Sequence, residues 1–290
     1  MREHALEVFA TGHQFLEAPR WHAGRLWASD FFAERVLRFD ESGAAETVAE
    51  VAGSPSGLGF LADGSILVVS RLDAKVLRID TAGALSEYAD LSDIAGGPAN
   101  DMLVTPSGHA YVGNFGFSAG DDPKPTSLAH IDPNRVVSRV EGDVGFPNGM
   151  ALTDDNRLLV AETLTHRITA FDIAADGSLT RPHLWAQLPD TYQPDGIAYD
   201  TDRGVWFGNA MTVTADAGFY RVEEGGEITD KIPVAGAWAV ACAFGGPHCS
   251  TLYLTCNATD EESFRNSSSA GYIATARVGR AGFASEHDPR

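Results

Sequence analysis

The sequence is short of basic residues, and it contains no long apolar segment. Its 21 lysines and arginines stand against 40 aspartates and glutamates, which gives a formal net charge of −19. Nucleic-acid phosphates and anionic membrane surfaces both bind clusters of Lys and Arg, so this balance argues against either partner. No window approaches the length of a transmembrane helix. Residues 1–7 lack the apolar run of a signal peptide, and we therefore expect a cytoplasmic protein.

Cysteine is also scarce, and its few positions show no metal-binding pattern. Cys242, Cys249 and Cys256 all fall late in the chain. An odd number of cysteines without a CxxC pair indicates reduced thiols, as in a cytosolic protein. A zinc site built on cysteine is disfavoured, because thiolate ligands usually come in closely spaced pairs.

The sequence signatures of several enzyme classes are missing. No GxSxG segment is present, which argues against a serine hydrolase with a nucleophile elbow. Neither GxGxxG nor GxxxxGK[ST] occurs, so nothing points to a nucleotide cofactor. The histidines show no HxH or HExxH spacing and give no sign of a histidine-based zinc centre.

What the sequence does contain is a repeat of paired short strands. Each copy has a turn residue, an apolar strand, a polar break and a second strand that often ends in Asp. The copies cover residues 24–40, 64–80, 108–132, 156–172, 204–222 and, more weakly, 251–276. Two further short strands flank each pair, so each unit holds about four strands and helical periodicity is absent. Four strands repeated at this spacing predict a β-propeller, and six copies predict six blades.

The predicted fold is therefore all-β: a single six-bladed propeller domain over residues 1–278, with four antiparallel strands per blade. Residues 6–10 have no partner in the first repeat. We expect them to supply the outer strand of the sixth blade, which closes the ring and removes an exposed edge. Residues 279–290 read as a loose tail. A pair of β-sandwiches or a solenoid would also explain the strands, but neither explains a repeated ligand position.

A second pattern places metal-capable side chains at one position of this repeat. Glu17, Asn100, Asn148 and Asp195 each open an innermost strand, and the last two lie in the related phrases Pro-Asn-Gly-Met-Ala and Pro-Asp-Gly-Ile-Ala. Ser56 stands at the same position in the second unit. In a propeller the innermost strands surround one axis, so these side chains converge at one mouth. Asn-Gly and Asp-Gly alone are common turn formers; four oxygen-bearing residues at one repeat position predict a cation site.

Carboxylate and amide oxygens are hard ligands, suited to Ca²⁺, Mg²⁺ or Mn²⁺. Glu17 and Asp195 balance a dication, while Asn100 and Asn148 add no charge. Ca²⁺ is the expected ion, because it tolerates irregular geometry from four separate blades. Four protein ligands leave room for water and substrate, as a catalytic site requires. Propellers also hold central cations for structure alone, and that alternative stays open.

A ring of polar residues is predicted around the metal, one at the end of the second strand of each unit. Its members are Ser29 or Asp30, Ser70, Asn114, Glu162, Asn209 and Asn257. We expect this ring to form the wall of a substrate pocket, with Asn100, Arg71, Asn114, Glu162 and Asn209 as the substrate-binding residues. Phe31, Phe115, Phe117 and Met211 follow closely and could supply apolar walls.

The motifs together resemble the gluconolactonase, regucalcin and senescence-marker-protein family of six-bladed propellers. The residues that carry the resemblance are 17–21 (Glu-Ala-Pro-Arg-Trp), Asn100-Asp101, 146–149 (Phe-Pro-Asn-Gly) and 194–196 (Pro-Asp-Gly). The resemblance implies that Glu17, Asn148 and Asp195 bind a divalent metal, commonly calcium or zinc. It also implies that Asn100 joins the metal shell or contacts substrate, and that Asp195 is the catalytic acid/base in the hydrolysis of sugar lactones.

The chain departs from this family at one sugar-binding position, where Pro98 stands in place of an arginine that some lactonases carry. The leading hypothesis is hydrolysis of a small lactone, in which the cation polarises the carbonyl and Asp195 activates water. One rival is a phosphotriesterase similar to diisopropylfluorophosphatase. Another is a non-catalytic calcium-binding propeller. A closed propeller needs no partner, so a monomer or weak homodimer is expected.

Overall fold

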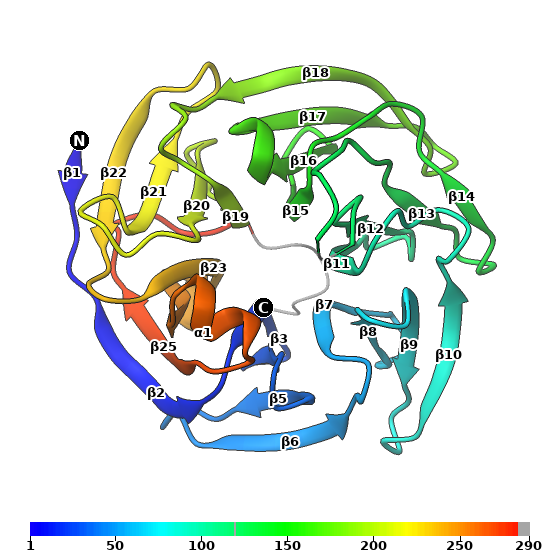
Figure 1. Ribbon diagram of the computed structural model, residues 1–290, viewed down its shortest axis with the longest axis horizontal. Coiled ribbons are helices and arrows are strands. Elements are labelled where there is room, and N and C mark those ends of the chain that lie inside the picture. The colour runs from blue at the N-terminus through cyan, green and yellow to red at the C-terminus, as the bar shows by residue number, and fades with distance from the viewer. Residues whose placement is uncertain (119, 284–290) are drawn as a thin grey trace.

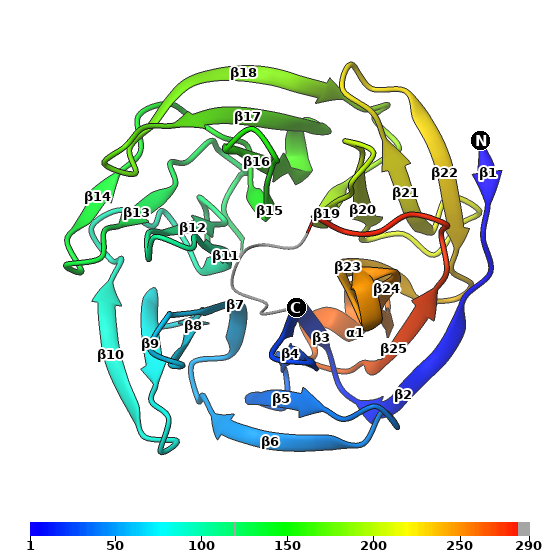
Figure 2. The same ribbon diagram turned by 180° about the vertical axis from the view of Figure 1, so that it is seen from behind.

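The computed structural model describes residues 1–118 and 120–283. Within these residues the strands form six sheets, arranged as blades around a central axis (Figure 1). Figure 2 shows the same ring from behind. The six-bladed β-propeller predicted from the repeat is confirmed, and the sandwich and solenoid alternatives are excluded.

The first three blades follow the chain from the axis outward, and each has four antiparallel strands. Blade one contains β3 (Leu16–His22), β4 (Arg25–Asp30), β5 (Arg35–Phe39) and β6 (Ala45–Glu50). Blade two contains β7 (Pro55–Phe60), β8 (Ile66–Ser70), β9 (Lys75–Ile79) and β10 (Leu85–Asp90). Blade three contains β11 (Ala99–Val104), β12 (Ala110–Asn114), β13 (Ala129–Ile131) and β14 (Val137–Arg139).

The last three blades repeat this order, and the outer strand of the final blade comes from the start of the chain. Blade four contains β15 (Pro147–Leu152), β16 (Arg157–Glu162), β17 (Arg167–Ile173) and β18 (Leu179–Gln187). Blade five contains β19 (Pro194–Tyr199), β20 (Val205–Asn209), β21 (Gly218–Val222) and β22 (Ile228–Pro233). Blade six contains β23 (Trp238–Gly245), β24 (Thr251–Ala258), β25 (Ala270–Ala276) and β2 (Glu7–His13).

The N-terminal segment closes the ring as predicted. β2 pairs antiparallel with β25, so the first and last parts of the chain share blade six. The two-residue strand β1 (Arg2–Glu3) was not predicted. It adds a parallel fifth strand to blade five by pairing with β22, and it covers the outer edge of that blade (Figure 1).

Both faces of a blade are covered by its neighbours, so successive strand residues are apolar. Leu67, Val68 and Val69 of β8 are all fully buried, whereas a sheet with one wet face would alternate apolar and polar residues. Between blades four and five, Leu159 and Ile168 pack in one cluster with Phe207. Burial of this kind between adjacent blades holds the axis rigid, and the axis is where the candidate site lies.

Helix is confined to short connections. These are the 3₁₀ turns Thr163–Thr165 and Pro247–Cys249 and the helix α1 (Glu261–Arg265) between β24 and β25. Across the described residues, no helix has both the length and the apolar character needed to span a membrane. The same residues contain no disulfide.

The predicted loose tail is wrong for residues 279–283. The Thr201 amide donates to the Ala281 carbonyl oxygen at 2.9 Å, and the Phe283 amide donates to the Tyr199 carbonyl oxygen at 3.0 Å. The Arg280 guanidinium contacts the Asp202 carboxylate at 3.0 Å. This segment is therefore bonded to the hairpin between β19 and β20. The rest of the predicted tail, residues 284–290, lies outside the described residues.

Candidate active site

The four predicted metal ligands occupy one structural position. Each is the second residue of an innermost strand, rather than the first as the sequence predicted: Glu17 in β3, Asn100 in β11, Asn148 in β15 and Asp195 in β19. Ser56 and Ala239 hold the same place in β7 and β23. The inner strands surround the axis (Figure 1), so the ring brings these positions to one end of it.

A bulge interrupts the sheet at each ligand. The register between the first and second strands shifts between Glu17 and Arg20 in blade one, and between Pro194 and Ile197 in blade five. The corresponding shift recurs in the other four blades. A bulge bends its strand and re-aims a side chain. The repeated sequence motif therefore coincides with a β-bulge in each blade, and the bulge re-aims the side chains at the candidate ligand positions.

In blades two, four and five a glycine follows this repeat position, and it serves a close approach between blades rather than a turn. None of Gly57, Gly149 and Gly196 has a positive φ angle. A methyl group added at Gly149 would lie 2.5 Å from the Ile197 amide nitrogen and 2.6 Å from the Asp195 carbonyl oxygen. At these three glycines the inner strand thus runs against the next inner strand so closely that only hydrogen fits. The turn-former explanation of these phrases is excluded.

Substitution of Gly149 by alanine should therefore move two ligands at once. Backbone atoms of the neighbouring strand cannot give way as a flexible side chain can, so we expect a loss of about 1–3 kcal/mol of stability. Metal affinity should fall at least tenfold, because Asn148 and Asp195 flank the contact. Calcium titration by calorimetry checks this. Gly108→Ala is the control: it strains an outer turn at φ +85° and should cost stability without changing affinity.

The two asparagines direct their amide nitrogens to neighbours that the blades supply. Asn100 Nδ2 donates to the Pro147 carbonyl oxygen at 3.2 Å. Asn148 Nδ2 lies 3.2 Å from Thr163 Oγ1, which in turn donates to the Pro194 carbonyl oxygen at 2.8 Å. These contacts link blades three, four and five. They fix the rotation of each amide and leave its carbonyl oxygen as the group available to a cation.

Of the two carboxylates of the set, Asp195 is buried and Glu17 is partly buried, and they repel one another. Burial, followed by the charge of Asp101, raises the pKa of Glu17 to about 8. Burial also raises the pKa of Asp195 well above its ordinary value, with further contributions from the charges of Glu17 and Asp101. Hydrogen bonds from Asn148 and Gly196 oppose that shift. The site therefore needs a positive charge or a proton to hold both groups.

Arg20 and Asp101 form an ion pair beside these ligands, and sequence reasoning gave neither a role. Arg20 Nη2 lies 2.7 Å from Asp101 Oδ1 and donates to the Met102 carbonyl oxygen at 2.9 Å. Its Nε donates to the Leu58 carbonyl oxygen of blade two at 3.2 Å. Arg20 thus neutralises Asp101 and ties three blades together. An arginine three residues after a candidate ligand, within an inner strand, was the signal that could have revealed it.

A hard divalent cation fits the residues present. With Asp101 paired to Arg20, Glu17 and Asp195 supply two charges that match a dication. Asp195 Oδ1 is buried and lacks a hydrogen-bond partner among the described residues, as expected of an oxygen reserved for an ion. The described residues hold no metal-binding group of three or more His, Cys, Asp and Glu. The candidate set is therefore a mixed one of two carboxylates and two amides.

Arg71 lies at the same end of the ring. It follows β8, and the Ala99 amide donates to its carbonyl oxygen at 3.0 Å, directly before Asn100. Its guanidinium carbon stands 4.2 Å from the Phe31 ring centre and 5.9 Å from that of Phe115. Burial lowers the pKa of Arg71 to about 10, and the charge of Glu17 opposes this shift. The charge of Glu17 therefore acts on Arg71, and the two side chains lie near one another at this end of the ring.

The residues of the polar ring, which the sequence predicted to form a pocket wall, make hydrogen bonds that hold the loops at this end of the ring. Asn114 Oδ1 accepts from the Gly116 amide and from Thr126 Oγ1. Both Glu162 oxygens are engaged, with Arg167 at 2.8 Å and the Gly145 amide at 2.6 Å. Asn209, Asp30 and Asn257 bind backbone groups in the same way. These contacts hold the loops at this end and leave Asn114 and Glu162 without a free oxygen for substrate.

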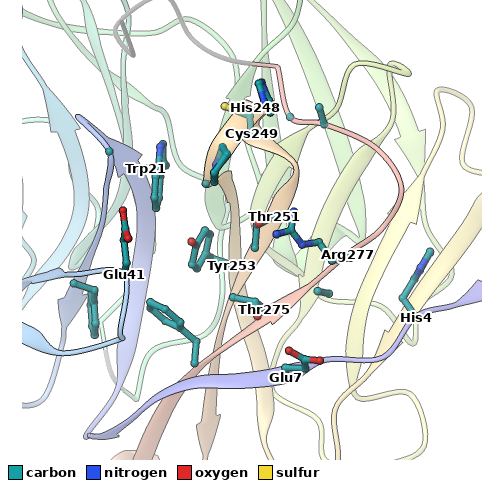
Figure 3. A pocket seen from close by; sticks show the side chains of 18 of the residues that line it. His4, Glu7, Trp21, Glu41, His248, Cys249, Thr251, Tyr253, Thr275 and Arg277 are labelled. Atoms are coloured by element: carbon teal, nitrogen blue, oxygen red, sulfur yellow. The ribbon is translucent and has the colours of Figure 1, made fainter. Parts of the chain in front are cut away.

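Two cavities lie toward the other end of the inner strands. One, of about 1580 Å³, is lined by Trp21, Tyr253, Arg277 and Glu7 among others (Figure 3). The second, of about 190 Å³, lies along the axis against residues such as Leu58, Ala198 and Phe244. Neither cavity is lined by any of the four candidate ligands or by Arg71. The metal-capable residues and these cavities are therefore separate features of the ring.

Taken as a class, the molecule is a six-bladed β-propeller with a mixed carboxylate and amide cluster on its axis. The chain belongs to the SMP-30/Gluconolactonase/LRE-like family, which its residues 15–258 match. It is 28% identical to the pentonolactonase XacC of Haloferax volcanii over 260 residues, covering 86% of this chain and 83% of that protein. It is 25% identical to the diisopropyl-fluorophosphatase of Loligo vulgaris over 201 residues, covering 61% and 63%.

Solved structures share the fold. A luciferin-regenerating enzyme superposes with a TM-score of 0.80 at 19% identity, covering 97% of both chains. A calcium-binding protein, regucalcin, from Agrobacterium tumefaciens superposes with a TM-score of 0.77 at 20% identity, covering 99% of both chains. At such identities the likeness establishes the architecture alone.

Proposed function

We propose that this protein is a divalent-metal-dependent hydrolase that opens the ring of a small lactone. The observation that carries the proposal is the pair Glu17 and Asp195, whose pKa values are both raised and whose buried Asp195 Oδ1 has no hydrogen-bond partner among the described residues. The named activity of the pentonolactonase relative supports lactones as the substrate class.

Glu17, Asn100, Asn148 and Asp195 would hold the cation. Their hard oxygens suit Ca²⁺, Mg²⁺ or Mn²⁺ better than Zn²⁺, and ligands drawn from four separate blades favour Ca²⁺, which tolerates irregular geometry. When bound, the cation polarises a carbonyl and stabilises negative charge on its oxygen. Asn100 and Asn148 are held by the blades through their nitrogens, so they orient the site without adding charge. Arg20 keeps Asp101 neutralised beside them.

Asp195 is the proposed general base. One oxygen serves as ligand and the other accepts the proton of the attacking water, which adds to the lactone carbonyl carbon. The bond from that carbon to the ring oxygen then breaks, and Asp195 returns the proton to the ring oxygen. The product is a hydroxy acid, which ionises at neutral pH. Glu17 acts mainly as a ligand, and Asn100 also orients substrate.

The test is a metal titration combined with an activity assay. Metal-free protein is titrated with Ca²⁺, Zn²⁺, Mg²⁺ and Mn²⁺ while gluconolactone and aliphatic lactones are followed with a pH indicator. We expect turnover to appear with one or more of these ions and to vanish in Asp195→Ala. Binding of the ion without turnover of any lactone would overturn the proposal and leave a structural cation in a non-catalytic propeller.

A second candidate, phosphoester or phosphofluoridate hydrolysis, is favoured by the similarity to diisopropyl-fluorophosphatase. The same cluster would then polarise a P=O group, and Asp195 would act as base or nucleophile. Paraoxon and a fluorophosphate are assayed beside the lactones to separate the two. Higher kcat/KM for the phosphorus compounds would replace lactones by these esters as the substrate class.

A further inference from the structure

Arg71 is a partly buried cation that forms no ion pair with the carboxylates of the described residues. Among the described residues no carboxylate oxygen lies within 4.0 Å of its guanidinium, whereas Arg20, Arg35 and Arg167 each form an ion pair. Its Nε is buried and unpartnered. A buried guanidinium normally makes several charge-assisted hydrogen bonds. The buried Nε–H of Arg71 therefore lacks an acceptor among the described residues, and the charge of Glu17 acting on Arg71 shows that it lies near the candidate metal set.

Two aromatic rings fix the guanidinium in place. Phe31 lies against it at 4.2 Å and Phe115 at 5.9 Å. Phe31 packs in turn on Phe15 and on Phe264 of α1, and Phe115 packs on Phe146 at 4.5 Å. A planar cation held between rings keeps its donors in one direction. Arg71 is therefore built to recognise a group at one place, unlike a mobile surface arginine.

The charges at this end leave Arg71 as the surplus. Asp101 is paired with Arg20, and a dication would be balanced by Glu17 and Asp195. Arg71 then contributes one uncompensated positive charge. The overall charge of −19 opposes an approaching anion, but surface charges are screened over about 8 Å at physiological salt. The nearby guanidinium of Arg71 therefore has more influence on an anionic substrate in the site than the distant surface charges have.

The surroundings also offer little to a polyhydroxylated ring. The side-chain oxygens of Asn114 and Glu162 already accept hydrogen bonds from backbone and side-chain donors of the protein. Pro98 has no side-chain donor for a substrate hydroxyl. The neighbours of Arg71 are aromatic. Unpaired hydroxyls against aromatic rings are unfavourable, so a substrate with one charged group and an otherwise apolar ring matches this end better.

We propose that the preferred substrate is a small lactone that carries a carboxylate, and that Arg71 binds this carboxylate while the ester carbonyl lies at the Glu17–Asp195 cluster. The inference rests on the proposed function, and it makes Arg71 the residue that determines specificity. Hydrolysis consumes one water, breaks the bond between the carbonyl carbon and the ring oxygen, and converts a monoanionic lactone into a dianionic hydroxy acid with release of one proton.

The activity test compares two lactones of equal ring size that differ in charge. They are 5-oxotetrahydrofuran-2-carboxylate and its neutral analogue 5-(hydroxymethyl)dihydrofuran-2-one. We expect kcat/KM to favour the carboxylate at least tenfold, the effect of one charge-assisted hydrogen bond. In Arg71→Met the ratio should fall to about one, and Arg71→Lys should recover part of it. Arg38→Met is the control, because Arg38 stacks on Trp27 at 5.3 Å in an outer part of blade one.

A binding test separates this inference from the proposed function. Tetrahydrofuran-2-carboxylate and tetrahydrofurfuryl alcohol cannot be hydrolysed, and their affinities are measured by calorimetry with and without Ca²⁺. We expect the carboxylate to bind more tightly in both states, and Arg71→Met to remove the difference. A preference that survives in Arg71→Met would place the carboxylate on the metal and overturn the inference. Failure of all lactones with intact Arg71-dependent binding would overturn the hydrolase proposal, and with it lactones as the substrate, but would keep Arg71 as the residue that binds a carboxylate.

Discussion

Replacing Asp195 with asparagine is expected to lower kcat by about 10²–10⁴-fold, the usual contribution of a general base. Asparagine has the same shape and keeps one oxygen for a cation, but it cannot accept a proton at neutral pH. Calcium should still bind, more weakly, because Glu17, Asn100 and Asn148 remain. Calorimetry and steady-state kinetics on the same preparation separate the loss of turnover from the loss of the ion.

The same substitution should stabilise the metal-free protein. Glu17 and Asp195 both have a pKa raised by burial and by neighbouring negative charge. Folding therefore favours their protonated forms. The stability they contribute is present below the ordinary value of 4.5 for Glu17 and is lost as pH rises through about 8. With Asp195 neutral, the unfolding free energy at pH 8 should rise by about 1–3 kcal/mol.

Thermal unfolding from pH 5 to 8, with and without calcium, measures this effect. Calcium should raise the melting temperature of the wild-type protein most at the alkaline end, where both carboxylates are charged. Asp176→Asn is the control, because hydrogen bonds from Ser178 lower the pKa of that exposed carboxyl. If Asp195→Asn kept full turnover, the base would have to be another group, and the role assigned to Asp195 would be wrong.

The repeat made the fold predictable from sequence, and it also predicted that the candidate ligands share one structural position. A strand pair copied six times specifies blades, and a polar residue repeated at one point of the copy specifies a place on the axis. Asn148-Gly149 and Asp195-Gly196 are informative because the glycine is required by contact between blades. The prediction began each of these strands one residue late, since the residue before each candidate ligand, Leu16, Ala99, Pro147 or Pro194, already belongs to the strand.

The partners of each polar side chain could not be predicted in the same way. Glu162 and Asn114 end apolar strands just as pocket residues would, but loops distant in sequence supply donors for all their oxygens. Arg20 and Asp101 belong to different blades, and only the closed ring brings them within 2.7 Å. Strand β1 is two residues long, too short for any periodic pattern. Such contacts form only in the assembled ring, so the local sequence does not predict them.

The largest expected loss of stability comes from blade five, where Arg221 is 1% exposed and Asp200 is fully buried. Arg221 Nε lies 2.6 Å from Asp200 Oδ2, and its Nη1 contacts Glu223 at 2.9 Å and Thr229 at 3.0 Å. Arg221→Met should cost about 3–5 kcal/mol, because it leaves a buried carboxylate without its counter-ion. Denaturant unfolding measures the loss. The exposed pair Arg38–Glu46 is the control, and Arg38→Met should cost at most about 1 kcal/mol.

Asp200 decides whether charge or packing causes that loss. Its carboxylate also accepts hydrogen bonds from the Gly204 amide at 2.9 Å and from Trp206 Nε1 at 3.1 Å, so it organises the β19–β20 hairpin as well as Arg221. Asp200→Asn combined with Arg221→Met removes the unpaired charge and should be more stable than Arg221→Met alone. A double variant less stable than the single one would show that the hairpin contacts of Asp200, and not its ion pair, hold blade five.

Because β19 carries Asp195, a destabilised blade five should also weaken calcium binding. The ion pair of Arg221 and Asp200 would then affect the candidate site on the axis.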